Sequence, residues 1–218
     1  AVDVSHLRRV LHSPDYHARA AATRVLGYWR DDVSEALNLL QEMANDDHPR
    51  VRLEAVRSAS FFETPEAGEI ALQALNHEMD YYLDYTLKQT MQALEPYWLP
   101  AVAAGQPFAK GNTEGIKFII STIKTPDLIN MARSGIVYNE MLNRHGVVFQ
   151  HRQEAIDGLA RLHNTTPMDE LLETISQLDT QDSEHGEHVL IDLGILLSRQ
   201  PGKNITKHRS QIEELTES

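Results

Sequence analysis

The sequence predicts an all-α protein, an α-solenoid of about six helical hairpins. Residues 46–59 read as one helix with a single apolar stripe formed by Val51, Ala55, Val56 and Ala59. The Arg-Leu-Glu-Ala block at 52–55 has a counterpart 33 residues earlier, at 19–22, and another 32 residues later, at 84–87. A further counterpart, at 152–155, lies about three periods after residue 52. A period in the thirties that contains two helices is typical of an α-solenoid.

Helix 46–59 carries its own start signal. We expect Asp46 or Asp47 to cap its first free amides, because a short acidic side chain can accept their hydrogen bonds. Pro49 suits the first turn, where no amide hydrogen is needed. Thr64-Pro65-Glu66 and 125–127 repeat the same kind of signal, which predicts further hairpins that begin there.

The expected hairpins form one repeat domain over residues 1–200, and they span about 4–29, 32–62, 65–95, 97–124, 126–163 and 167–199. Proline and glycine break the rhythm between 96 and 111, so we expect one short helix at about 98–104 and then a helix over 113–122. An interruption is expected near Ser134 and Gly135, and a helix at 149–162. Residues 201–218 are predicted to be a polar tail, either with a frayed helix at about 207–216 or disordered.

Composition narrows the function classes. The chain of 218 residues has a formal net charge of −12, which opposes nucleic-acid binding by phosphate neutralisation, although a local basic patch around Arg50, Arg52 and Arg57 is an open alternative. It contains no cysteine, which excludes disulfides, Cys-ligated zinc and thiol nucleophiles. No apolar run reaches the roughly 20 residues of a membrane span. Because it starts at Ala1 without a signal segment, we expect a processed product or an excised part of a larger protein.

Metal binding is the first chemical alternative. His185 and His188, with Glu184 and Glu187, have the spacing of a local site, but they lie at an expected loop–helix junction where a solvated helix start is the simpler interpretation. The acidic residues of 179–184 lack the alternating ligands and central glycine of a calcium loop. We therefore expect no metal site.

Catalysis is the second alternative. Serine stands near histidine at Ser5-His6 and at 183–185, but neither serine lies on a glycine-flanked elbow. No glycine-rich phosphate loop follows a strand. The sequence therefore predicts no catalytic residue, no cofactor and no enzyme.

The repeat motif resembles a known family. Asp-x-x-x-Val-Arg-x-x-Ala at 47–55 resembles the second helix of a HEAT repeat. Longer blocks resemble the HEAT-repeat segment of the PVC-type haem-binding proteins, and they lie at 21–31, 48–57, 60–62, 82–87, 94–98 and 152–155. This resemblance covers residues 15–165 well and the remainder loosely.

The resemblance implies a domain order and a role. Such proteins carry a propeller that resembles sugar dehydrogenases before the repeats and a c-type cytochrome domain with Cys-x-x-Cys-His after them, and they are exported. Without cysteine this chain cannot hold haem through thioethers, so the resemblance implies a non-catalytic scaffold or docking domain. Its partners would be neighbouring domains of the parent chain or another protein.

Two other functions stay open. One is a free-standing protein–protein interaction module. The other is a metal-dependent HEAT-like enzyme that resembles the iron-binding hydroxylases, whose repeats hold two irons through His-Glu pairs. Here only His77-Glu78 has that order, while the corresponding helix positions read Leu53-Glu54 and Gln153-Glu154.

The repeat alignment also predicts an inter-repeat ladder. Arg19, Arg52 and Asp84 fall at equivalent positions of successive repeats. Since Asp84 inverts the sign of the charge, we expect it to pair with Arg52 across the repeat boundary, with exposure of all three to solvent as the alternative.

Overall fold

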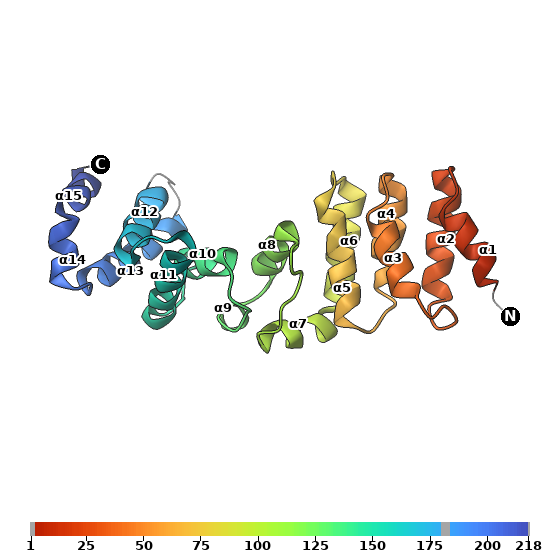
Figure 1. Cartoon of the computed structure of the whole chain (residues 1–218), viewed down its shortest axis with the longest axis horizontal. Helices are drawn as coiled ribbons and strands as arrows, with labels where there is room; N and C mark the ends of the chain where they lie inside the picture. The colour runs from red at the N-terminus through yellow and green to blue at the C-terminus, as the bar shows by residue number, and fades with distance from the viewer. Residues whose placement is uncertain (1–2, 180–183, 218) are drawn as a thin grey trace. The chain divides into compact units, whose positions relative to one another are not determined.

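The computed structural model describes residues 3–179 and 184–217, without the side chains of 184–186 and 214–217. The described residues form fifteen α-helices and one 3-10 helix, and they contain no strand. This confirms the predicted all-helical α-solenoid, which is drawn in Figure 1. The chain divides into two compact units, residues 1–122 and 123–218.

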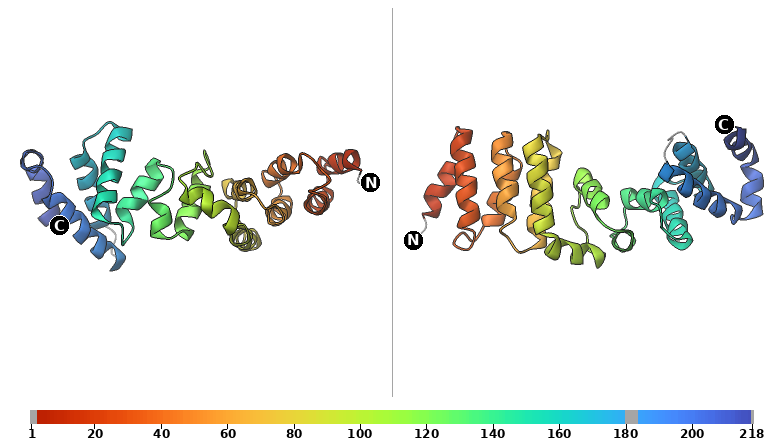
Figure 2. Two further views of the ribbon diagram at one scale, coloured as in Figure 1. Left: turned by 90° about the horizontal axis from the view of Figure 1, so that it is seen from below. Right: turned by 180° about the vertical axis from the view of Figure 1, so that it is seen from behind.

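The first unit begins with three hairpins. Its helices are α1 (Val4–Leu11), α2 (Tyr16–Tyr28), α3 (Ala36–Ala44), α4 (Pro49–Ala59), α5 (Pro65–Leu72), the 3-10 helix η1 (Gln73–Asn76), α6 (Tyr81–Ala93), α7 (Glu95–Ala103) and α8 (Thr113–Thr122). Helices α1 and α2, α3 and α4, and α5 and α6 pack as pairs. The second helices of the pairs, α2, α4 and α6, stand side by side, and the left view of Figure 2 shows them from below.

Buried hydroxyl groups join successive second helices at regular intervals. Ser58 Oγ of α4 donates to the Thr23 carbonyl of α2 at 3.2 Å. One repeat later, Thr90 Oγ1 of α6 donates to the Val56 carbonyl of α4 at 3.0 Å. Gly27 allows the first of these approaches, because a Cβ there would lie 2.8 Å from Cβ of Ser58.

The start of α4 differs from the prediction in one respect. Pro49 is the first helical residue, as expected, but the N-cap residue is His48, whose Nδ1 accepts from the Arg50 amide at 3.1 Å. Asp46 does not cap the helix, because its carboxylate accepts from the His48 amide and from the Arg19 guanidinium. The local cap rule could not anticipate a partner that lies 27 residues earlier in the chain.

The region of the expected fourth hairpin is irregular, as predicted. Helix α7 begins at Glu95, earlier than expected, because Pro96 occupies the first turn, and it continues through Pro100. Trp98 Nε1 donates to the Met91 carbonyl at 2.8 Å, which fixes α7 against the end of α6. Asn112 Nδ2 donates to the Leu72 carbonyl at 2.9 Å and thereby anchors the loop before α8 to α5.

The second unit contains α9 (Thr125–Leu128), α10 (Gly135–Asn143), α11 (Phe149–His163), α12 (Pro167–Asp179), α13 (Glu184–Ser198), α14 (Gly202–Lys207) and α15 (Arg209–Glu217). The predicted interruption near Ser134 is present, and Ser134 caps α10 by accepting from the Val137 amide. Helices α10 and α11 pack closely because Gly158 faces the Tyr138 ring, where a Cβ would lie 2.3 Å from the ring.

The C-terminal region contains α14 and α15, and α15 lies close to the helix that the sequence offered at about 207–216. His208 between them is buried, and its Nε2 lies 3.1 Å from Oδ1 of Asp169 in α12. Because the buried residue is polar and its partner lies on a helix distant in sequence, local hydrophobicity does not indicate the packing of His208 against α12.

Candidate interaction surface

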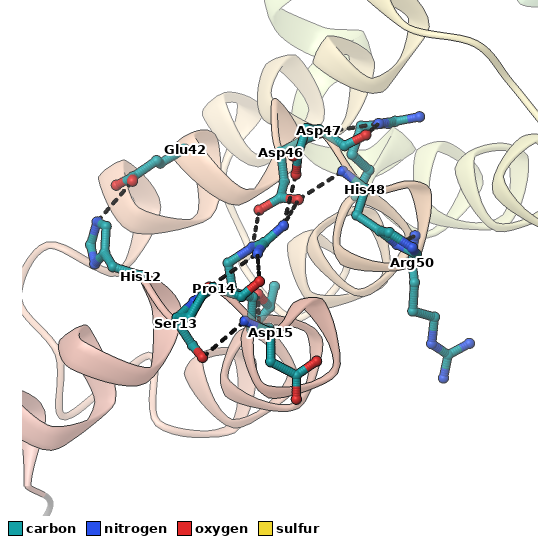
Figure 3. Close-up of polar contacts among 12 residues, drawn as sticks. His12, Ser13, Pro14, Asp15, Glu42, Asp46, Asp47, His48 and Arg50 are labelled. Carbon is teal, nitrogen blue, oxygen red and sulfur yellow. Dashed lines mark hydrogen bonds and ion pairs between the residues drawn. The ribbon is translucent and has the colours of Figure 1, made fainter.

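Arg19, the first member of the predicted ladder, joins two successive hairpins. Its Nε and Nη2 donate to the two carboxylate oxygens of Asp46 at 2.7 and 2.8 Å, and Nη2 also donates to Asp47 at 2.7 Å. Its Nη1 donates to the Ser13 carbonyl at 3.0 Å. Figure 3 shows Asp46 and Asp47 beside the loop that contains Ser13 and Pro14. The guanidinium therefore bridges the loop before α2 and the loop before α4.

Arg52 occupies the same position one repeat later. Its Nη1 donates to the carbonyls of Asp46 and Asp47 at 2.8 and 3.0 Å, and its Nη2 donates to the Glu78 carbonyl at 3.2 Å. The partners of Arg52 are backbone carbonyls of two loops. Asp84 accepts from Lys88 on its own helix at 2.6 Å. Within the described residues, the expected pair of Arg52 and Asp84 is therefore replaced by these contacts.

Arg152 of the second unit uses the same kind of contact. Its Nε donates to the Val147 carbonyl at 3.1 Å, five residues earlier, as Arg52 does to Asp47. Arg152 also contacts a residue later in the chain, because its Nη2 donates to Oδ2 of Asp192 at 3.0 Å. Burial lowers the pKa of Arg152, while Asp192 opposes that shift.

The Asp46 carboxylate is buried enough for burial alone to raise its pKa, but hydrogen bonds from Arg19 and from the His48 amide outweigh burial and lower the pKa below the ordinary value of 3.8. A carboxyl with a lowered folded pKa stabilises the protein fully above its unfolded pKa, and this contribution is lost as pH falls through the folded value.

We expect Asp46→Asn to reduce the free energy of unfolding at pH 7, and we expect this difference from the wild type to shrink as the pH falls below about 4. Neutralising the carboxylate by protonation removes the same charge that the substitution removes. Urea titrations at pH 7 and at about pH 3 measure both differences. An equal or larger penalty at the lower pH would contradict the assignment.

A cluster of three arginines surrounds a buried glutamate on the exposed face of α2 and α4. Arg24 Nε and Nη2 donate to the two oxygens of Glu54 at 3.0 and 2.5 Å. Arg50 Nη2 lies 3.0 Å from Oε1 and Arg57 Nη1 lies 3.7 Å from Oε2. The Glu54 side chain is 2% exposed, whereas those of the arginines are 44–51% exposed. We call Arg24, Arg50 and Arg57 the arginine cluster.

Exposed aromatic side chains lie on α2, one of the two helices of the arginine cluster, and on α6, the helix that packs against α4. Tyr82 of α6 stands 32 residues after Arg50, at the equivalent position of the next repeat, and both Tyr82 and Tyr85 are exposed. At the other end of α2 and α4, the exposed Tyr28 stacks on Phe61 with ring centroids 5.7 Å apart. Arginine and tyrosine are enriched at protein interfaces. This combination is therefore the strongest candidate for an interaction surface.

The sequence contained a signal for the cluster. Arg50 and Arg57 lie at i−4 and i+3 from Glu54, the spacings at which helical side chains meet. Arg24 precedes Arg57 by 33 residues, one repeat period. The sequence left a basic patch around Arg50, Arg52 and Arg57 as an open alternative, but Arg52 is buried and belongs to the loop contacts. Arg24 is instead the third arginine of the cluster.

The described side chains contain no group of three His, Asp or Glu residues arranged to hold a metal ion. The side chains of Glu184 and His185, and the whole of Asp182, lie outside the described residues. None of the described helices is long and apolar enough to cross a membrane.

The fold and this surface define a helical-repeat protein of the kind that serves as a scaffold or interaction module. Comparison with protein families makes this more specific, because residues 4–92 match the family model of HEAT repeats. The hairpins α1–α6 are thus a HEAT-repeat segment. Neither the curated proteins nor the solved structures gave a match.

Proposed function

We propose that this chain is a non-catalytic docking domain of a larger exported redox protein, in which it connects dehydrogenase-like and cytochrome c domains. Two features support the proposal. The HEAT repeats over residues 4–92 belong to a class that generally mediates protein–protein contacts. The redox context rests on the sequence blocks that resemble the HEAT-repeat segment of the PVC-type haem-binding proteins.

The observation that carries the docking role is the arginine cluster beside exposed tyrosines. Three partly exposed guanidinium groups sit on one buried carboxylate, in a chain whose net charge is −12. Stacked hairpins hold such groups at fixed separations, because each repeat packs on its neighbours. The surface is thus preorganised for a partner protein.

The full coding sequence around this chain tests the redox context. We expect a propeller-encoding region upstream and a Cys-x-x-Cys-His motif downstream, in one reading frame with the repeats. A reading frame with neither region would contradict the redox context and leave a free-standing interaction module.

A further inference from the structure

We infer that the arginine cluster binds an acidic peptide segment of a partner protein, with the tyrosines of α6 holding the side chains that flank its carboxylates. This inference names the partner of the surface described above and rests on the proposed docking function.

The charge balance of the cluster favours an anionic ligand. Three guanidinium groups share the single carboxylate of Glu54, which leaves a formal local charge of 3 − 1 = +2. Arg50 and Arg57 each contact Glu54 through one terminal nitrogen. A guanidinium has a planar set of donors that matches a carboxylate in a bidentate geometry. The outward side of the cluster can therefore receive carboxylates from a partner.

Glu54 positions the arginines before any ligand arrives. Its contacts with Arg24 span two hairpins, and its contacts with Arg50 and Arg57 lie along one helix. Free arginine side chains lose considerable rotamer entropy when they bind, whereas these three are already restrained. The buried carboxylate thus raises the affinity of the surface for an anion although it carries the same sign of charge.

The neighbouring helix decides between a peptide and a nucleic acid. The α6 residues that stand 32 positions after Arg50, Glu54 and Arg57 are Tyr82, Thr86 and Gln89, all uncharged. Lys88 of α6 is paired with Asp84. A continuous phosphate chain requires a continuing series of cations, and here the series stops after two helices. A short acidic segment followed by apolar side chains fits both the arginines and the exposed tyrosines.

Fluorescence anisotropy of labelled peptides tests the inference. The acidic probe is a fluorescein-labelled peptide of six glutamates followed by two phenylalanines, and its matched control has glutamine in place of glutamate. We expect the intact chain to bind the acidic probe at least about tenfold more tightly than the control, and the acidic binding to weaken as salt rises.

Variants locate the binding on the surface. We expect Arg24→Gln/Arg57→Gln to weaken acidic binding about tenfold or more, and Arg9→Gln, an exposed arginine on α1, to leave it within about twofold. Since the first variant leaves Glu54 with fewer partners, Tyr82→Ala/Tyr85→Ala provides a second test on exposed residues. We expect it to weaken binding severalfold without changing the helical circular-dichroism signal.

Three results would overturn the inference: equal binding of the glutamate and glutamine peptides, unchanged affinity in both double variants, or tighter binding of a ten-nucleotide thymidine oligomer than of the acidic peptide. These outcomes are separable from the redox context. If the coding sequence contains the redox domains but the acidic peptide does not bind, only the peptide inference is contradicted. If the acidic peptide binds but the coding sequence contains no redox domains, only the redox context is contradicted.

Discussion

Replacing Arg152 with alanine is expected to lower the free energy of unfolding of the second unit by about 3–5 kcal/mol. The Arg152 side chain is 1% exposed, and its guanidinium donates to the carbonyls of Leu142, Arg144 and Val147. Alanine leaves these carbonyls without their donor and removes most of the buried side chain, so unsatisfied polar groups and a cavity both contribute.

Urea denaturation followed by circular dichroism measures this loss. Arg161→Ala is the matched control, because Arg161 lies on the same helix and is exposed. We expect the control to change the free energy by no more than about 0.5 kcal/mol. A change of that size in Arg152→Ala would show that the buried guanidinium is not required for the packing of α10 against α11.

The second large effect is the coupling between Arg19 and Asp46. We expect Arg19→Ala and Asp46→Asn to show a coupling energy of about 1–3 kcal/mol in a double-mutant cycle. The pair is bidentate, joins two hairpins, and has side chains that are only 14% and 7% exposed. These features separate it from an ordinary surface ion pair, which contributes roughly 0–1 kcal/mol.

A parallel cycle on Arg52→Ala and Asp84→Ala provides the control. Because Arg52 donates to loop carbonyls and Asp84 accepts from Lys88, we expect their coupling to be near zero. Coupling as large as that of Arg19 with Asp46 would restore the pairing that the sequence predicted. Absence of coupling in both cycles would contradict the bridging role of Arg19.

The sequence predicted much of the fold because the strongest signals were local. Pro49 and Pro65 occupy the first turns of α4 and α5, and the apolar stripe of Val51, Ala55 and Val56 is buried. Each of these signals can be recognised within a single helix, from its first turn or from its helical spacing. Arg19 and Arg52, which the repeat period aligns, both contact the loop before their own helix.

Partners across repeats were harder to predict than positions. The helical period indicates which face a side chain occupies, but it does not distinguish a carboxylate partner from a backbone carbonyl. Arg52 takes the carbonyl of Glu78, and Asp46 becomes a partner of Arg19 rather than a cap. In the sequence, Glu54 belongs to the repeat block and to the position compared with the iron-binding His-Glu pairs, and neither pattern indicates its burial under three arginines. Burial of a charged residue depends on the neighbouring hairpin, so it cannot be predicted from the sequence of one helix.

The hydroxyl bonds from Ser58 to Thr23 and from Thr90 to Val56 determine how adjacent repeats can slide. Apolar contacts alone tolerate small shifts along the helix axes, but a shift of one turn, roughly 5.4 Å, separates each donor from its acceptor. Each separated group would then be buried without a partner, at about 1–3 kcal/mol. The hydroxyl groups therefore fix the register of adjacent repeats. Sliding of α2, α4 or α6 along its neighbour would break these hydrogen bonds and would cost free energy.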